Sequence, residues 1–360
     1  MKLSIKTVVL QEMVSRSVKG ASCNKLIPIT SLMAIQLKDK TLRLITTDAS
    51  NTLYIMHDDI NGEDFYCVVQ VEQFSKLISK MTSDDISLEV ENGILNVTGN
   101  GSYRIELPMD ENGEMITYPD PVADVKLDGE LKNIDAATVK TILSTNKASL
   151  AITMETPVYT GYYVADKVIT TDSYKICGLN IEVLDEPTLI APETMNLLDV
   201  MTEEKIGVCM NEEIIEFITK DCVIYSHKME GINDFPIVPT SRLLNEKFKS
   251  SCKVSKNDLL ALLDRINLFV GVYDNKSIRL TFTEEGIDVS SKQSNGIETI
   301  KYMQSKGYKP YTCNIDIVAL IQQVKSNASD SIEIQYGNEN SIKMIEGNVT
   351  QVIALLGDEE

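Results

Sequence analysis

Apolar residues recur at helical spacing in three widely separated segments of the chain. In each segment they follow an i, i+3, i+4 pattern, which is typical of a helix with one buried face. The three sets are Leu10, Met13 and Val14; Val139, Ile142 and Leu143; and Leu259, Leu262 and Leu263. A second helix is predicted after each of these, at 68–81, 189–201 and 311–324, with Phe74, Met195 and Val318 in equivalent places. The chain is therefore expected to repeat one pair of helices three times.

Outside the helices the pattern changes to the alternation of half-buried antiparallel strands. The segments "SLEVENGILNVTG" (87–99) and "SIRLTFTEEGIDVSS" (277–291) both alternate and both break at a glycine turn. Each repeat is predicted to run helix, strands, helix, strands. This order favours an α+β fold.

A short turn motif supports the repeat. "LITTDASNTL" (44–53) is echoed by "VITTDSYKIC" (168–177), and more faintly by "DVSSKQ" (288–293), where Lys292 replaces the aspartate. Coincidental similarity among ordinary α+β domains is the alternative, but helix order, spacing and turn chemistry recur together. Polar, proline-containing stretches near 118–131 and 235–250 separate the repeats, so we expect domains at 1–122, 123–244 and 245–360.

Composition excludes several classes of protein. No apolar run approaches the ~20 residues that span a bilayer, and Glu12 comes too early for a signal peptide, so a cytoplasmic protein without a membrane partner is expected. The seven cysteines are odd in number, scattered and without a CxxC pair, which indicates reduced, mostly buried thiols. His57 and His227 stand apart from any ligand set at metal spacing. Neither a metal nor another cofactor is predicted.

Catalytic signatures are also missing from the sequence. It contains no phosphate-binding glycine loop, HExxH motif or nucleophile elbow, and acidic pairs such as Asp84 and Asp85 lie beside turns, where solvation explains them. We therefore expect a protein that is not an enzyme. An unrecognised enzyme stays open as an alternative, and it would need a pocket with converging polar groups and shifted pKa values.

Taken together, these motifs resemble a known family. The threefold unit, "TTDSYKI", "LIAPETMNLLDVM", "MEGINDFP" and the C-terminal "VTQVIALL" are similar to the bacterial replicative sliding clamp, the β subunit of DNA polymerase III. The resemblance implies three clamp domains per chain and a head-to-tail homodimer that closes into a ring around duplex DNA without reading its sequence. It also implies a non-catalytic processivity factor whose partners are DNA polymerase, a clamp loader and other proteins carrying a short clamp-binding peptide. The alternative is a clamp-fold docking platform that does not encircle DNA.

The same resemblance implies an interface between two copies. Antiparallel sheets end in edges that invite uncontrolled pairing, and closing a ring removes them. The positions that correspond to the family's interface are Ile105 and Leu107, which would face Phe269 and Val270 of the other copy. These four residues could instead be core of their own chain.

The net charge of −19 counts against tight binding to DNA, because phosphate neutralisation drives that binding. A closed ring removes the objection, since topology holds it on DNA and weak phosphate contacts suffice. The basic residues expected to face DNA are Arg16, Lys19, Lys25, Lys76, Lys80, Lys140, Lys147, Arg265 and Lys325. Lys25 corresponds, with an offset of one residue, to a DNA-contacting arginine of the family. Each of these could equally be an ordinary solvated residue.

The resemblance finally implies a cleft that takes partner peptides between the second and third domains. Its expected lining is Tyr159, Thr171, Tyr174, Ile176, Pro236, Val352, Ile353, Ala354, Leu355 and Leu356. Apolar anchors with hydrogen-bonding neighbours suit such a pocket, although Ile176 and Val352 could simply be core. Ser173, Tyr174 and Lys175 stand where the family usually has glycine, histidine and arginine, so the peptide preference is expected to differ.

Overall fold

The computed structural model describes residues 2–22, 24, 26–120, 131–271, 276–292 and 295–357. The chain forms two compact units, residues 1–139 with 193–228, and residues 140–192 with 229–360. The predicted boundary at 122 lies outside the described residues. The middle of the chain is shared between the two units, so the three domains expected from sequence do not coincide with them.

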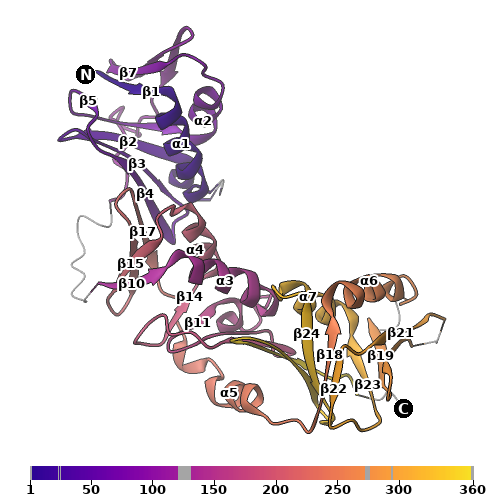
Figure 1. The fold of residues 1–360 in the computed structure, drawn as a ribbon. Helices are drawn as coiled ribbons and strands as arrows, with labels where there is room; N and C mark the ends of the chain where they lie inside the picture. Colours follow the sequence, from indigo (N-terminus) through magenta and orange to yellow (C-terminus); the bar gives the residue numbers. More distant parts are fainter. Residues whose placement is uncertain are drawn as a thin grey trace. The chain divides into compact units, whose positions relative to one another are not determined.

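Secondary structure repeats three times along the chain in the order strand, helix, strands, helix, strands (Figure 1). The first repeat comprises β1 (Lys2–Lys6), α1 (Thr7–Ser17), η1 (Val18–Gly20), η2 (Pro28–Ser31), β2 (Leu32–Lys38), β3 (Thr41–Thr47), β4 (Asn51–His57), β5 (Asn61–Gly62), β6 (Phe65–Gln70), α2 (Val71–Ser79), β7 (Asp85–Glu91), β8 (Ile94–Thr98) and β9 (Ser102–Glu106).

The second repeat follows the same order. It comprises β10 (Lys132–Asp135), α3 (Ala136–Asn146), η4 (Lys147–Ser149), η5 (Pro157–Thr160), β11 (Tyr162–Val164), β12 (Val168–Thr171), β13 (Lys175–Leu179), β14 (Thr188–Ile190), α4 (Pro192–Leu197), η6 (Leu198–Val200), β15 (Lys205–Met210), β16 (Ile214–Ile218) and β17 (Cys222–His227). A connector with η7 (Ile232–Asp234) and α5 (Ile237–Asn245) leads to the third repeat.

The third repeat completes the chain. It comprises β18 (Ser250–Ser255), α6 (Lys256–Asn267), β19 (Ser277–Phe282), β20 (Gly286–Ser291), β21 (Ile297–Lys301), β22 (Gln304–Lys306), β23 (Tyr311–Asp316), α7 (Ile317–Ser326), β24 (Ser331–Tyr336), β25 (Ser341–Glu346) and β26 (Val349–Ala354). The predicted helices are confirmed, but each second helix starts later than expected, because the residues before it pair as strands β6, β14 and β23.

The described residues form four antiparallel sheets. The first unit contains the sheets β5-β1-β7-β8-β9 and β10-β15-β16-β17-β4-β3-β2-β6, and the second contains β14-β11-β12-β13-β26-β25-β24-β18-β22 and β21-β20-β19-β23. Two of these sheets run through a repeat boundary. Strand β17 of the second repeat pairs with β4 of the first, and β26 of the third pairs with β13 of the second. Main-chain hydrogen bonds thus join successive repeats.

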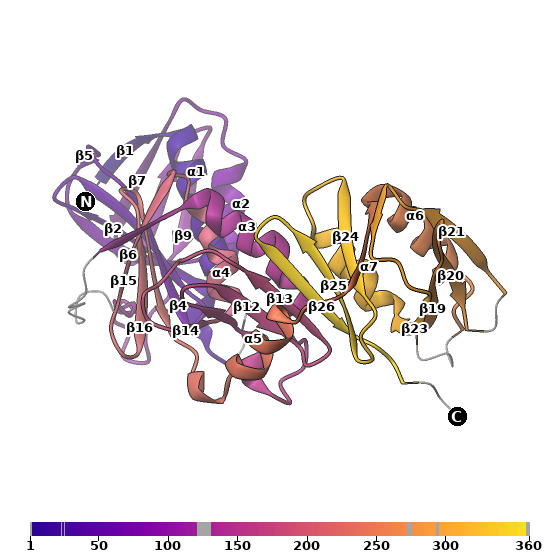
Figure 2. The same ribbon diagram turned by 60° about the horizontal axis from the view of Figure 1, so that its bottom comes forward.

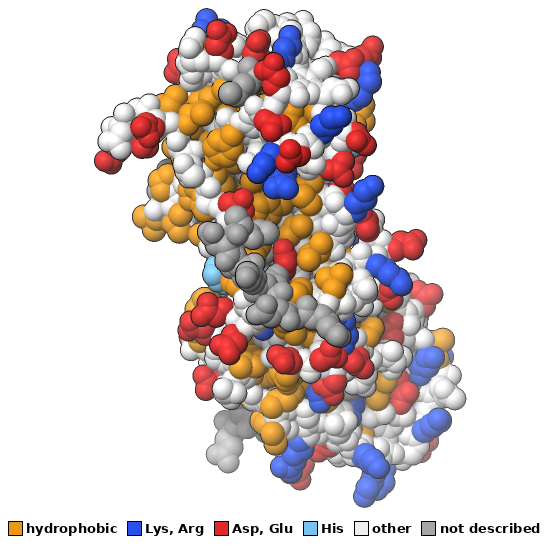
Figure 3. Space-filling model, turned by 90° about the vertical axis from the view of Figure 1, so that its left-hand side faces the viewer, with side chains coloured by type: hydrophobic (Ala, Val, Ile, Leu, Met, Phe, Trp, Pro, Cys, Tyr) orange, Lys and Arg blue, Asp and Glu red, His pale blue; other side chains and the backbone are white. Residues whose placement is uncertain are grey.

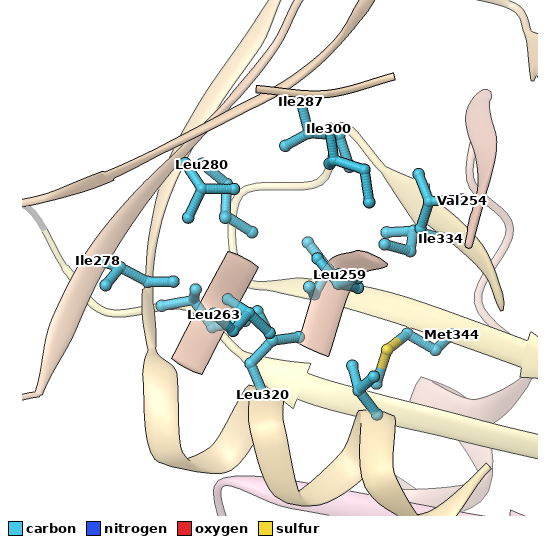
Figure 4. Close-up of a cluster of buried hydrophobic side chains, with 14 of the residues drawn as sticks. Val254, Leu259, Leu263, Ile278, Leu280, Ile287, Ile300, Leu320, Ile334 and Met344 are labelled. Atoms are coloured by element: carbon cyan, nitrogen blue, oxygen red, sulfur yellow. The ribbon is translucent and has the colours of Figure 1, made fainter. Parts of the chain in front are cut away.

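Each unit has helices packed side by side against its sheets (Figures 1 and 2). In the second unit, Leu259 and Leu263 of α6 and Leu320 of α7 point into one apolar cluster (Figure 4). Strand residues such as Ile278 and Ile334 complete it from the sheets, and all five side chains are at most 2% exposed. The helical spacing in the sequence therefore marks the buried faces correctly.

The two threonine–aspartate turns have the same geometry. Asp48 accepts main-chain hydrogen bonds from Ser50 and Asn51 at 2.9 and 2.7 Å. Asp172 accepts the equivalent bonds from Tyr174 and Lys175 at 3.0 and 2.7 Å. This bonding fixes a tight turn in which the residue after each aspartate is left-handed, with φ of 82° at Ala49 and 78° at Ser173.

A left-handed φ is costly for residues with a β-carbon. We therefore expect Ser173→Gly to raise the free energy of unfolding of the second unit by about 0.5–1 kcal/mol, after the entropy lost by glycine is counted. Urea unfolding followed by tyrosine fluorescence measures this change. Ser173→Ala, which keeps the β-carbon, serves as the control and should bring no gain. Destabilisation by the glycine would contradict the assignment of strain to this turn.

Candidate partner groove and nucleic-acid interface

An apolar cluster in the second unit contains some of the residues predicted to line the peptide cleft. Ile176 of β13 and Val352 of β26 are paired across the sheet and are 7% and 3% exposed. They pack with Phe235, and Tyr159 lies against the same cluster. Tyr174 next to them is 71% exposed. The structure therefore brings Ile176, Val352 and Tyr159 of the predicted lining together, beside Phe235 of the DFP segment.

The remaining members of the predicted lining have different surroundings. Thr171 is buried at 3% exposure, and Ile353 belongs to the cluster drawn in Figure 4, on which Leu355 also packs. Leu356 bridges to Asn314. Pro236 and Ala354 are half-buried. Alternation along β26 explains the split, because successive side chains of a strand point to opposite faces.

Helix α5 adds a groove that the sequence reading missed. The groove has a volume of about 1000 Å³ and lies between α5 and the loop that joins β24 to β25. Its lining is Val238, Pro239, Arg242, Leu243, Asn245, Glu246, Gly337, Asn338, Glu339 and Asn340. The groove adjoins the predicted cleft, because the amide of Leu355 donates to the carbonyl of Asn340 at 2.9 Å.

The sequence carried a signal for α5. Ile237, Leu243 and Leu244 are apolar at helical spacing, and all three pack on the cluster of Ile176 and Phe235. The prolines of the same stretch favour a domain boundary instead. The exposed face of α5 includes Val238, which is 77% exposed. A groove that combines apolar side chains of α5 with charged and amide groups suits a short peptide with apolar anchors and polar neighbours.

Several predicted DNA-binding side chains lie on the surface, but acidic neighbours neutralise some of them. Lys76 pairs with Glu72 at 2.5 Å, Lys19 with Asp199 at 3.3 Å, and Arg265 with Glu298 at 2.6 Å. Lys80, Lys140, Lys147 and Lys325 are also exposed. Lys25 lies outside the described residues. On the face drawn in Figure 3, basic side chains lie singly among acidic ones, which fits the negative net charge.

Arg16 does not occupy the place expected of a DNA contact. It is 9% exposed, its Nη1 and Nη2 donate to Asp221 at 2.6 and 3.2 Å, and its Nε donates to the carbonyl of Val200 at 3.0 Å. This bidentate ion pair fastens α1 of the first repeat to the second repeat. Its donors are directed into the protein, so we leave Arg16 out of the proposed DNA-binding set.

The predicted interface residues fall into two groups. Ile105 and Leu107 are 2% and 5% exposed within their own chain, so both side chains belong to its buried core. Phe269 is 50% exposed and its ring lies against Gly296, just before β21. Val270 packs partly on the core of the second unit. Only Phe269 of the four thus offers a largely exposed apolar surface.

Reactive chemistry is sparse in the described part of the chain. No group of histidine, cysteine or acidic residues there is arranged to hold a metal. Six cysteines within the described ranges are buried and form no disulfide, and burial raises the pKa of Cys67, Cys177 and Cys252 to about 12. None of the described helices has the length and apolar character needed to cross a membrane.

Comparison with known proteins defines the class of the fold. The chain superimposes on the DNA polymerase sliding clamp of Bacillus subtilis with a TM-score of 0.87 and 17% identity, covering 100% of both chains. The beta subunit of Streptococcus pyogenes DNA polymerase gives a TM-score of 0.87 at 16% identity, with 99% and 100% coverage. The sliding clamp of Bartonella birtlesii, bound to griselimycin, gives 0.83 at 14% identity, with 99% of each chain covered. The chain therefore has the fold of the bacterial sliding clamps over its full length.

Sequence comparison adds a family to this class. Residues 1–119 match the model for the DNA polymerase III beta subunit, N-terminal domain. No curated protein matches the chain. The first third of the chain thus carries the sequence signature of the DNA polymerase III beta subunit, and the whole chain shares its fold.

The Arg16–Asp221 pair predicts a pH effect on the first unit. Burial opposes ionisation of Asp221, but the hydrogen bonds and charge of Arg16 outweigh it and lower the pKa of Asp221. A lowered pKa stabilises the folded state above the ordinary value of about 3.9, and this contribution is lost as the pH falls further. Asp221→Asn should cost about 1–3 kcal/mol at pH 7, less than a fully buried pair would, and flatten the acid dependence.

Urea unfolding at pH 7 and pH 3 tests the prediction. Asp199→Asn, which removes the exposed partner of Lys19, is the matched control and should change stability little. Parallel pH profiles for the wild type and Asp221→Asn would show that the ion pair does not stabilise the unit.

Proposed function

We propose that the protein is a DNA sliding clamp, a ring-shaped processivity factor that encircles duplex DNA and tethers a polymerase without catalysis of its own. The observation that carries the proposal is the full-length likeness to bacterial sliding clamps, at TM-scores of 0.82–0.87. The match of residues 1–119 to the beta-subunit model supports it independently. The domains are the three repeats, at about 1–122, 123–244 and 245–360.

The internal repeat supplies a physical reason for ring closure. By element order, β9 is equivalent to β17 and β26, and β21 is equivalent to β4 and β13. The pairs β17–β4 and β26–β13 are formed within the chain, whereas β9 and β21 end their sheets. A free edge carries unpaired main-chain donors and acceptors. Pairing β9 of one copy with β21 of another repeats the existing junctions and closes a head-to-tail homodimer.

Within such a ring the helices of the repeats line the hole and face the DNA. Lys19, Lys25, Lys76, Lys80, Lys140, Lys147, Arg265 and Lys325 form the proposed DNA-binding set. Because Lys19, Lys76 and Arg265 are also held by carboxylates, the attraction to phosphate is weak. Weak, sequence-independent contact lets a ring slide, while closure keeps it on the duplex.

The groove beside α5 is the proposed docking site for polymerase, clamp loader and other peptide-bearing partners. The apolar cluster of Ile176 and Val352 lies under α5, and Tyr174 is exposed at its edge. Griselimycin, which is bound in the Bartonella birtlesii clamp structure, is a convenient probe, and we propose that it occupies this groove.

Retention on DNA tests the ring directly. The protein, loaded onto nicked circular DNA by a clamp loader, is expected to stay bound in high salt and to be released once the circle is cut, because it slides off the new ends. Gel filtration of labelled protein with DNA before and after cutting measures this. Equal release from circular and linear DNA would point instead to a docking platform that does not encircle DNA.

Phe269 tests the proposed junction. Replacing its exposed ring by a carboxylate in Phe269→Asp is expected to weaken the dimer at least tenfold, because burial of the remaining apolar surface is worth about 1–2 kcal/mol and a charge opposes it. Sedimentation equilibrium measures the dissociation constant. Val238→Asp, a matched change on exposed α5, should leave the dimer intact. A wild-type protein that is monomeric at all concentrations would exclude the ring.

A further inference from the structure

Lys343 on β25 is a buried lysine with an unusual set of contacts. The residue as a whole is only 4% exposed. The ammonium Nζ donates to the carbonyl of Leu244 at 2.9 Å and to that of Glu246, and it lies 5.3 Å from the centre of the Phe248 ring. Burial lowers the pKa of Lys343. Placing an ammonium there costs desolvation, so these contacts must compensate for it.

The acceptors lie at the C-terminal end of α5. The last carbonyls of a helix lack partners within the helix and carry the negative end of its dipole, which a cation stabilises. Lys343 supplies the missing donors, and the face of Phe248 accepts the same positive charge. The lysine thus ties both the end of α5 and the chain that leaves it to strand β25.

A second contact holds α5 on the other side of β26. Leu244 lies so close to Gly178 of β13 that an added β-carbon would stand 2.6 Å from its Cδ1. In the sheet β26 lies between β13 and β25. Helix α5 therefore crosses β26 and is fixed at both flanking strands, by apolar packing on β13 and by the ammonium on β25.

Helix α5 forms one wall of the groove, through Val238, Arg242 and Leu243, and the β24–β25 loop forms the other. The loop is held independently, because Tyr311 donates from its hydroxyl to the carbonyl of Asn338. The width of the groove consequently depends on where α5 sits. That position depends in turn on Lys343 and on the space above Gly178.

We propose that Lys343 is a positioning residue for partner binding: its ammonium fixes the C-terminal end of α5 and so keeps the groove open at the width that a partner peptide requires. The proposal rests on the proposed function, since it assigns the groove to clamp partners. It is also specific to the side chain, because an apolar residue of the same length would fill the space and leave the carbonyls of Leu244 and Glu246 without a donor.

Two substitutions perturb α5 from its two anchors. Lys343→Met removes the ammonium and keeps the volume, and Gly178→Ala pushes on Leu244 from below. In both variants the amides of 237–249 are expected to exchange hydrogen at least tenfold faster, and griselimycin is expected to bind about tenfold more weakly by calorimetry. Lys253→Met, at an exposed lysine of the same unit, is the control and should change neither quantity.

The readouts separate positioning from general destabilisation. Exchange in β13 and β26 and the dimer dissociation constant should match the wild type in each variant. Unchanged exchange in α5, or faster exchange with unchanged griselimycin affinity, would overturn the role of Lys343 while leaving the clamp proposal intact. A wild-type protein that stays on circular DNA but fails to bind griselimycin would overturn the inference together with the groove assignment. Failure of retention on circular DNA would count against the proposed function itself.

Discussion

Main-chain pairing across the repeat boundaries is the constraint on which the rest of the structure depends. Strand β17 completes a sheet begun by the first repeat, and β26 completes one begun by the second. Each junction satisfies a row of donors and acceptors that would otherwise be exposed or buried without partners. For this reason the second repeat is divided between the two compact units, and the repeats are not independent domains joined by linkers.

Side-chain interactions of different chemistry also link the repeats at the two junctions. In the first unit this interaction is the Arg16–Asp221 ion pair. In the second unit the ammonium of Lys175, which is also paired with Asp172 at 3.3 Å, donates to the side-chain oxygen of Gln322 of α7 at 2.6 Å, and Gln323 donates to Ser149. The contact across the first junction therefore joins two charged groups, whereas the contacts across the second junction end on neutral groups. Protonation of Asp221 acts directly on the first contact, because this carboxylate accepts the hydrogen bonds of Arg16.

Much of the fold was readable from sequence because its signals are local. Leu259, Leu262 and Leu263 mark a buried helical face, and the aspartate turns at Asp48 and Asp172 close in the same way. What the sequence did not reveal is which side chains contact partners far away in the chain. Arg16 looks like an exposed polar residue until Asp221, 205 positions away, is placed against it. For Ile105 the sequence left open whether the side chain belongs to the core of its own chain; the side chain is 2% exposed, and a place of β9 in an interface stays a prediction.

The buried thiols have a practical consequence for studying assembly. Thiolates are the reactive form of cysteine, and in Cys67, Cys177, Cys222, Cys252 and Cys313 burial raises the pKa to about 12. At neutral pH these sulfurs stay protonated and out of reach of reagents. Once Cys23 is replaced, new cysteines placed on β9 and β21 would react far faster than these five native ones. Formation of a disulfide between β9 of one copy and β21 of another could then be followed without interference from these five thiols.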